Sequence, residues 1–259
     1  MVKNTYRIAV GKTFLRISFS TVLAAILVVC AAGPAPAGAP ARSIGEILSK
    51  TAANYRAIHA FTAVFSQKTV SAAATTLGAQ KAGGMLYYAK PRQMRWVYET
   101  PEKQVFVANN KFAWLYTSEE NRITLFDSQK LFASPLASTF FDGALRLRNN
   151  FNVSLDPVLS TPDMAVLQLL PLKKDPSIKS AYLWIDLRTH LISRVETRDL
   201  LGNTNTITIS SFTPRPSLDP GLFQLQVPAM AKVFDASGRM LPPARVEQLQ
   251  STITSGSRH

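Results

Sequence analysis

The chain has 259 residues, with 29 lysines and arginines against 16 acidic residues, a formal net charge of +13 and a single cysteine. A hydrophobic fraction of 46% and a charged fraction of 17% exclude a disordered chain and a charged coiled coil. One cysteine excludes a disulfide framework and a metal site built from a cluster of thiolates.

The first 39 residues are predicted to be a secretory signal peptide. A basic segment without acidic residues precedes an uncharged, largely aliphatic stretch over residues 17–32. A run of glycine, proline and alanine follows, and it contains the small residues that signal peptidase requires around Ala37 and Ala39. We therefore expect the mature protein in the periplasm.

A transmembrane anchor and a lipoprotein signal are the two alternatives to a signal peptide for this segment. A transmembrane anchor needs about 20 apolar residues, and prolines interrupt this stretch too early. Acylation at Cys30 would make the protein a lipoprotein, but Val29 stands where a small residue normally precedes such a cysteine.

The mature chain is predicted to begin with one amphipathic helix over about Ile44–Ile58. Ser43 and Glu46 have the spacing of a capping box, in which side chains satisfy the free amide groups at a helix start. Apolar residues then recur at the spacing of one helical face.

After this helix the pattern changes to short strands about ten residues apart, which is typical of an antiparallel sheet that curls or closes. The predicted strands are 61–66, 85–88, 94–99, 104–108, 112–116, 122–126, 152–155, 164–170, 178–186, 192–199, 204–212 and 222–227. Asn109-Asn110 predicts a hairpin turn. Ser134-Pro135 predicts a short apolar helix that ends near Phe141. From about Ala236 the chain is polar, and we predict a loose tail with weak helical character near Val246–Leu249.

No constellation of catalytic or metal-binding residues is recognisable. His59, His190 and His259 lack a carboxylate or a second histidine at ligand spacing, which favours structural or surface roles. The sequence has no nucleophile elbow, P-loop or dinucleotide-binding fingerprint. We therefore expect no enzymatic activity, no cofactor and no metal. The basic charge fits either a surface near anionic lipid headgroups or a generally basic protein, and an exported protein is a poor candidate for binding nucleic acid.

Large apolar side chains are concentrated between Met85 and Tyr116. Taken singly, each is explained by an ordinary hydrophobic core. As a set, they also fit a sheet wrapped around an apolar interior whose aromatic and methionine side chains line an adaptable pocket.

Three segments in this order resemble one family. Residues 61–67, Phe-Thr-Ala-Val-Phe-Ser-Gln, resemble the F-x-A-x-F-x-Q motif of the LolA-type outer-membrane lipoprotein carriers. Residues 84–96 are similar to the G-x-L-x-x-x-[KR]-P-x-x-x-x-W segment of that family, and residues 223–228 resemble its F-x-F-x-x-P segment. The resemblance covers about residues 44–234.

The resemblance implies an open, incomplete β-barrel of about eleven antiparallel strands, covered by a lid of short helices. The domain organisation then becomes a signal peptide over 1–39, a half-barrel carrier domain over 40–235 and a polar tail over 236–259. The implied function is to carry triacylated lipoproteins, as a monomer, from an ATP-driven releasing complex in the inner membrane to a receptor in the outer membrane.

The resemblance also implies site residues. We expect a lipid-binding cavity lined by Phe61, Phe65, Leu86, Met94, Trp96 and Trp114. Leu136, Phe140 and Phe141 of the short apolar helix would face it as part of the lid. A basic residue before the proline of the second motif ties the barrel to the lid in this family; it is commonly arginine, and here it is Lys90, which lacks the planar donor fork.

Three other functions compete with this interpretation: a close relation with a different role, a regulator of a different class, and an enzyme. A LolB-type receptor shares the fold but requires an acylated Cys30. A lipid-sensing periplasmic regulator with a similar half-barrel usually carries a second domain, for which this chain has no room beyond Ala236. A periplasmic hydrolase would need a catalytic constellation.

Overall fold

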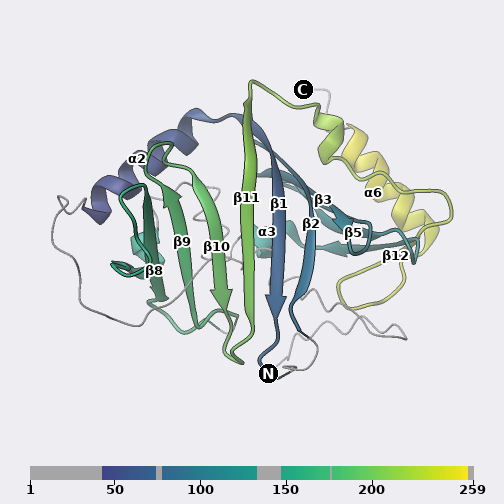
Figure 1. Cartoon of the computed structure of the whole chain (residues 1–259). Helices are drawn as coiled ribbons and strands as arrows, with labels where there is room; N and C mark the ends of the chain where they lie inside the picture. Colours follow the sequence, from purple (N-terminus) through teal and green to yellow (C-terminus); the bar gives the residue numbers. More distant parts are fainter. Residues whose placement is uncertain (1–42, 74–77, 133–146, 176, 256–259) are drawn as a thin grey trace.

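A computed structural model describes residues 43–73, 78–132, 147–175 and 177–255. The predicted signal peptide and the predicted helix over 135–141 lie outside these residues. The described chain forms one strongly bent sheet of 12 strands with a few helices around it (Figure 1).

The sheet combines two consecutive runs of strands. The first run comprises β1 (Ala60–Val70), β2 (Gln80–Ala89), β3 (Gln93–Thr100), β4 (Gln104–Ala108), β5 (Ala113–Thr117) and β6 (Arg122–Phe126). The second run comprises β7 (Phe151–Leu155), β8 (Met164–Pro171), β9 (Ser180–Asp186), β10 (Ile192–Arg198) and β11 (Thr204–Arg215). The strand order is β12-β6-β5-β4-β3-β2-β1-β11-β10-β9-β8-β7, so β1 and β11 join the two runs at the centre.

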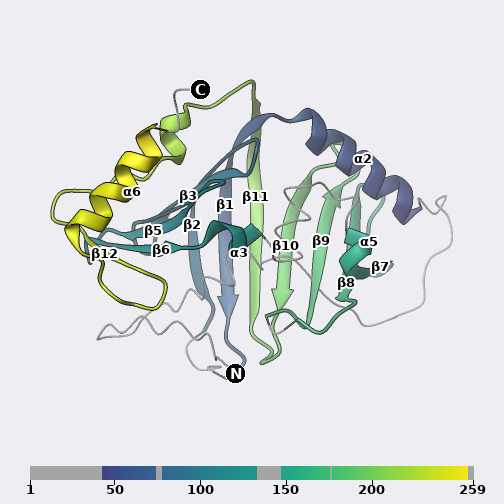
Figure 2. The ribbon, with the colours of Figure 1, turned by 180° about the vertical axis from the view of Figure 1, so that it is seen from behind.

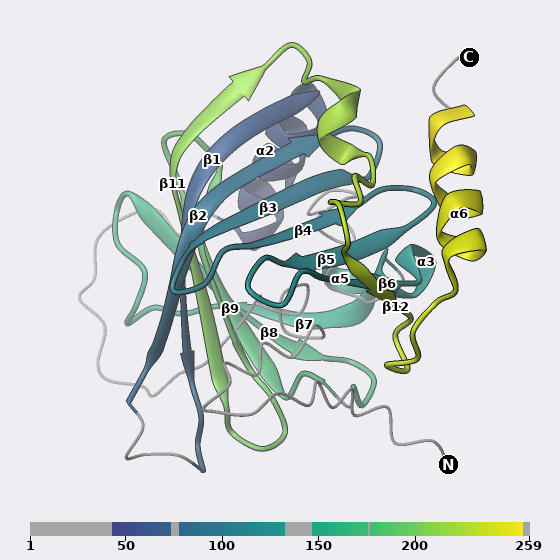
Figure 3. The same cartoon turned by 90° about the vertical axis from the view of Figure 1, so that its right-hand side faces the viewer.

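The predicted fold class is confirmed. Strands β1–β11 pair antiparallel with their neighbours, and the sheet order ends at β7 and β12 without pairing these two edges. In the side view the sheet bends so that β7–β9 lie behind β2–β5, as in a barrel left open on one side (Figure 3). Eleven of the predicted strands are present within a few residues of their predicted ranges.

Helices lie on both sides of the sheet. α2 (Ile44–Ala57) lies on the inner side, across one end of the strands, while η3 (Pro220–Phe223) and α6 (Pro243–Ser255) lie outside β3–β5 (Figures 2 and 3). Two short helices, α3 (Ser128–Phe132) and α5 (Leu147–Asn150), follow β6 and precede β7. We refer to the sheet face on the α2 side as the inner face, and to the face covered by residues 218–246 as the outer face.

α2 begins and ends as predicted. Ser43 is its N-cap, and its hydroxyl accepts a hydrogen bond from the amide of Glu46 at 3.1 Å. The buried side of the helix, formed by Ile47, Leu48 and Ala52, packs against β7–β10 in one hydrophobic cluster. Most of the stability of such a short helix comes from this packing rather than from its propensity.

The C-terminal region departs from two predictions. Residues 222–227 were expected to form a strand, but they form the end of η3 and an extended segment that pairs with no strand. Phe223 and Leu225 are buried in the outer cluster against Trp114 and Val107, so their alternation reflects burial against a sheet rather than pairing within it. Farther along the chain, a strand of three residues, β12 (Lys232–Phe234), pairs in parallel with β6.

The tail after Ala236 was expected to be loose, with weak helical character near residues 246–249, but it contains a longer helix. α6 spans Pro243–Ser255, and Val246 packs against the outer cluster together with Leu241. The segment that leads to it is also fixed by side chains of the sheet. Asn109 donates a hydrogen bond to the carbonyl of Phe223 at 2.9 Å, and Arg95 donates one to the carbonyl of Leu222 at 3.0 Å.

Gly84 marks a close approach of the β2 and β3 backbones. The register between these strands shifts between Gly83 and Gly84. A Cβ atom on Gly84 would lie 1.8 Å from the carbonyl oxygen of Val97, which belongs to the backbone and cannot turn aside.

We therefore expect Gly84→Ala to lower the free energy of unfolding by about 1–3 kcal/mol, as other overpacked sites do. Chemical denaturation measures this change. Gly45→Ala in α2 is the matched control, because its Cβ would meet only the Ser43 hydroxyl at 3.8 Å, and it should be neutral or stabilising. Equal stability of the two variants would contradict the close approach.

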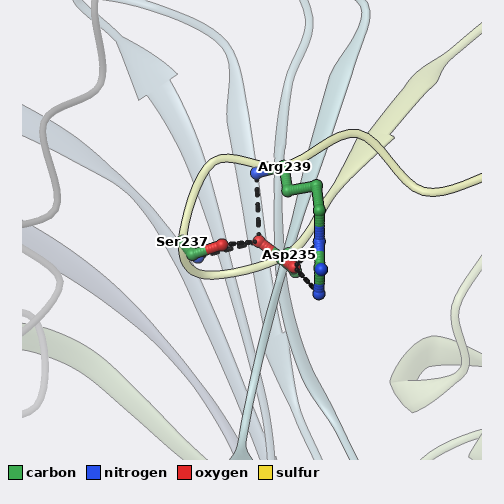
Figure 4. Close-up of polar contacts among 3 residues, drawn as sticks. All are labelled: Asp235, Ser237 and Arg239. Atoms are coloured by element: carbon green, nitrogen blue, oxygen red, sulfur yellow. Dashed lines mark hydrogen bonds and ion pairs between the residues drawn. The ribbon is translucent and has the colours of Figure 1, made fainter.

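A turn after β12 is organised by one carboxylate. Asp235 accepts hydrogen bonds from the hydroxyl of Ser237 at 2.5 Å and from the amide and side chain of Arg239 at 3.0 and 3.1 Å (Figure 4). These bonds, the Ser237 hydroxyl first, lower the pKa of Asp235 from 3.8 to about 2. A lowered carboxyl pKa stabilises the folded turn above the ordinary pKa, and that stabilisation is lost as the pH falls through the folded value.

The Asp235 carboxyl should accordingly titrate near pH 2 when its chemical shift is followed by NMR. Ser237→Ala removes the largest of these interactions and should move the midpoint toward 3.8. Ser217→Ala, at an exposed position elsewhere, serves as the control. An unchanged midpoint in Ser237→Ala would show that the hydroxyl does not stabilise the carboxylate.

Candidate functional site

The inner face of β1–β6 carries an unbroken band of large apolar side chains. Strand register aligns them across the sheet: Leu86 lies between Ala63 and Trp96, and Trp96 pairs with Phe106. The band belongs to one hydrophobic cluster, whose largest members are Phe61, Phe65, Leu86, Tyr88, Met94, Trp96, Tyr98, Phe106, Leu115 and Ile207. Five of the six residues predicted to line a cavity are therefore together on one face.

The aromatic rings of the band are packed edge to face and stacked. Phe65 meets Trp96 and Tyr98 edge to face, at centroid distances of 4.7 and 5.0 Å. Phe61 stacks on Phe212 of β11 at 4.5 Å, so the band continues across the central strand pair. Gly84 lies between Phe65 and Tyr98 in the register and leaves room for their rings.

The polar side chains of Trp96 and Tyr98 have hydrogen-bond partners in the band or at its end. The indole N–H of Trp96 donates to the sulfur of Met94 at 3.3 Å. Two further hydrogen bonds lie near the C-terminal end of β1. The hydroxyl of Tyr98 donates to the side-chain oxygen of Gln67 at 3.1 Å, and the side-chain amide of Gln67 donates to the side-chain oxygen of Asn205 at 3.0 Å. Burial raises the pKa of Tyr98, so its hydroxyl stays protonated at neutral pH. The band thus offers soft apolar contact and no group poised for acid–base catalysis.

Trp114 does not belong to this band. It was predicted to line the cavity, but its side chain is buried in the outer cluster with Phe223 and Leu225. Neighbouring residues of a strand face opposite sides, and Ala113 and Leu115 already occupy the inner face of β5. The sequence pattern Ala-Trp-Leu-Tyr is apolar on both faces, so it gave no signal of which side was inward.

α2 is attached to the β9–β10 end of the sheet by polar contacts as well as by packing. The side-chain amide of Asn54 donates to the carbonyl of Thr189. The hydroxyl oxygen of Tyr55 accepts a hydrogen bond from the amide of Ile192 at 3.2 Å. Burial raises the pKa of Tyr55 to about 12, against a smaller lowering by that amide.

Lys90 attaches the same helix to the other side of the half-barrel. It follows β2, and its ammonium donates to the carbonyls of Tyr55 and Arg56 in the last turn of α2, at 2.9 and 2.7 Å. A cation is favoured beside the last carbonyls of a helix by the helix dipole. Desolvation lowers the pKa of Lys90 from its ordinary value. The acceptors are main-chain atoms, which is why no residue pattern in the sequence could identify them.

The remaining predicted lid residues, Leu136, Phe140 and Phe141, lie outside the described residues. Among the residues that the structure does describe, no three histidine, cysteine or acidic side chains come together as a possible metal site. Within the same part of the chain, no helix combines the length and the apolar character needed to cross a bilayer.

The chain matches the model of the family described as outer membrane lipoprotein carrier protein LolA over residues 56–226. The chain belongs to the LolA family. The resemblance found in the sequence motifs is thereby confirmed, and the inner band lies within the matched residues.

Two relatives show the extent of this LolA similarity. A protein of Methylococcus capsulatus named outer-membrane lipoprotein carrier protein is 26% identical over 159 residues, which are 60% of this chain and 73% of the relative. A protein of the same name from Aeromonas salmonicida is 26% identical over 175 residues, 68% of this chain and 82% of the relative. Among solved structures, an uncharacterized conserved protein from Thermus thermophilus has a TM-score of 0.49 and 14% identity, over 75% of this chain and 99% of its own.

The contact of Lys90 with α2 leads to a prediction for this LolA-family chain. Lys90→Leu removes two charge-assisted hydrogen bonds, each of a kind that contributes about 1.5–3 kcal/mol, reduced here by solvent exposure. Amide hydrogen exchange in the last turn of α2 should accelerate by about tenfold or more.

Lys50→Leu is the matched control on the same helix, because Lys50 forms only an exposed ion pair with Glu46. Its exchange rates should stay close to those of the original protein. Lys90→Arg should retain most of the protection, since arginine also donates to carbonyls. If Lys90→Leu and Lys50→Leu gave the same exchange rates, Lys90 would not be holding the helix.

Proposed function

We propose that this protein is a periplasmic carrier that holds the acyl chains of lipoproteins against the inner face of its half-barrel. In this proposal residues 1–39 are a cleaved signal peptide, residues 40–235 are the carrier domain and residues 236–259 are a C-terminal extension. The observation that carries the proposal is the continuous apolar band on the inner face of a LolA-family sheet.

The chemistry of the band supports acyl chains rather than a polar ligand. Each methylene group exposed to water costs about 0.8 kcal/mol, so three acyl chains cost on the order of tens of kcal/mol in the aqueous periplasm. Phe65, Met94 and Trp96 are buried in the structure, so acyl chains would reach their polarizable surface only after the cover moves. The indole N–H of Trp96 is already paired with the sulfur of Met94, so an incoming chain would leave neither atom newly unpaired.

Release of the cargo requires that the cover over the band can move. α2 packs on one half of the sheet and is held to the other half through the Lys90 ammonium. We infer that Lys90 is the latch of this cover, and that the lid includes Leu136, Phe140 and Phe141. In the proposed cycle the monomer receives triacylated lipoproteins from an ATP-driven inner-membrane complex and delivers them to an outer-membrane receptor.

A release experiment tests the proposal directly. Purified mature protein is added to spheroplasts of its source cell, and the supernatant is analysed for a soluble one-to-one complex with a triacylated lipoprotein. The proposal predicts such a complex. If the protein stays empty while a known carrier releases lipoprotein from the same spheroplasts, the carrier function is refuted.

Met94→Glu tests the placement of the acyl chains. A carboxylate in the middle of the band would have to be desolvated next to the chains, so the yield of complex should fall by at least about tenfold. Met85→Glu is the matched control, because Met85 lies on the outer face of the neighbouring strand β2, where it pairs with Val64 and Val97.

Circular dichroism and thermal melting establish whether each variant is folded. Met94→Leu, which keeps the apolar character, should release lipoprotein at close to the original yield. A folded Met94→Glu variant with the original yield would place the acyl chains elsewhere.

A further inference from the structure

One end of the sheet presents a rim that neither the inner band nor the outer cluster uses. Strand register places the ends of neighbouring strands side by side there: Val70 pairs with Thr204, and Arg198 pairs with Thr204 from the other side. The amide of Lys179 donates to the carbonyl of Arg198 at 2.9 Å, which adds the start of β9 to the row. Figure 1 shows these ends at the bottom of the sheet, opposite to α2.

Apolar side chains project into solvent along this rim. Leu201 is 81% exposed and Leu200 is 48% exposed in the turn between β10 and β11, and Leu172 is 59% exposed at the end of β8. Leu170 and Val70 beside them are also exposed. A row of exposed leucines on one edge costs solvation free energy and marks a surface that contacts an apolar phase or a partner.

The same rim is strongly basic. Seven exposed cations lie on the strand ends and connections that form it: Lys68, Lys81, Arg148, Lys173, Lys174, Lys179 and Arg198. None of the seven forms an ion pair with a carboxylate of the described residues. The nearby carboxylates have local partners instead: Asp199 accepts from the amides of Leu201 and Asn203, and Asp175 accepts from Ser177.

The opposite end of the second strand run shows a different combination. Val158 and Leu159 are 54% and 42% exposed in the turn after β7. Exposed side chains of both signs lie near this turn: the main-chain carbonyl of Asp163 accepts a hydrogen bond from the amide of Leu187 at 2.8 Å, and Arg188 follows Leu187. At the rim, by contrast, seven exposed cations stand against Asp175 and Asp199, so the exposed leucines there lie in an excess of positive charge.

We propose that the rim is a docking surface for an anionic phospholipid membrane. Leucine side chains beside unpaired lysines match the two layers of a membrane surface, because the apolar groups enter the headgroup region while the cations meet lipid phosphates. Docking by the rim would stand the sheet upright on the bilayer, with α2 and its Lys90 contact on the far side. The proposal concerns the lipid surface itself and does not depend on the carriage of lipoproteins.

Vesicle sedimentation tests the rim. The protein, recovered in processed form from the periplasm, is mixed with lipoprotein-free vesicles of phosphatidylglycerol and phosphatidylcholine, and with vesicles of phosphatidylcholine alone. Binding should require phosphatidylglycerol and weaken as the salt concentration rises. Lys173→Glu/Lys174→Glu and, separately, Leu200→Ser/Leu201→Ser should each lower the affinity by at least about tenfold.

Two matched double variants test whether any loss of binding is specific to the rim. One changes the net charge elsewhere on the protein, and the other removes exposed apolar side chains elsewhere. Lys111→Glu/Arg188→Glu changes the net charge equally at the other end of the strands, and Val158→Ser/Leu159→Ser removes exposed apolar groups there. Both should bind as the original protein does. No vesicle binding, or an equal loss in all four variants, would overturn the proposal.

Loss with the lysine variant but not with the leucine variant would also overturn it, because that result describes a site for an acidic partner or a soluble anion rather than a membrane. The spheroplast assay keeps the two proposals separate. A protein that releases lipoprotein but does not sediment with vesicles refutes the rim alone, and the reverse result refutes the carrier alone.

Discussion

The pairing of β1 with β11 is the contact on which the rest of the molecule depends. It joins residues 60–70 to residues 204–215, and so turns two separate runs of strands into one sheet. Phe61 and Phe65 of β1 meet Phe212, Ile207 and Ile209 of β11 across this pairing, which makes the inner face continuous through the middle of the half-barrel. Such a distant contact is formed against a large loop-closure entropy, so the apolar band also stabilises the topology that creates it.

α2 covers the inner side of the sheet on the β7–β10 half, beside the apolar band of β1–β6. Its packing lies almost wholly on the β7–β10 half, whereas Lys90 comes from the end of β2 in the other half. One helix is thus bound firmly on one side and by a single side chain on the other. In the function proposed above, this asymmetry would let the helix be released at one edge without unfolding.

The two faces and the two ends of the sheet have separate tasks. The outer face is closed by residues 218–246, so Trp114 and Ile123 are buried there and the sheet is stable without any ligand on that side. The inner band is bounded at one end by α2 and at the other by the paired polar side chains of Gln67, Tyr98 and Asn205. Beyond those polar side chains lies the basic, leucine-bearing rim, so the surface proposed to meet a membrane is at the end away from the contact between Lys90 and α2.

The sequence by itself determined the class of fold, the first helix and eleven strands, because these follow from periodicity, capping and turn residues that act over a few positions. Five of the six residues that the family motifs led us to expect at a cavity, Phe61, Phe65, Leu86, Met94 and Trp96, lie together in the inner band. Only the tertiary structure decided the rest. Trp114 faces outward because Ala113 and Leu115 fill the inner side, and residues 222–227 cover a sheet instead of joining it. Lys90 binds main-chain carbonyls, and the rim gathers lysines and leucines from strand ends far apart in the chain; both depend on register between distant segments, which no local pattern encodes.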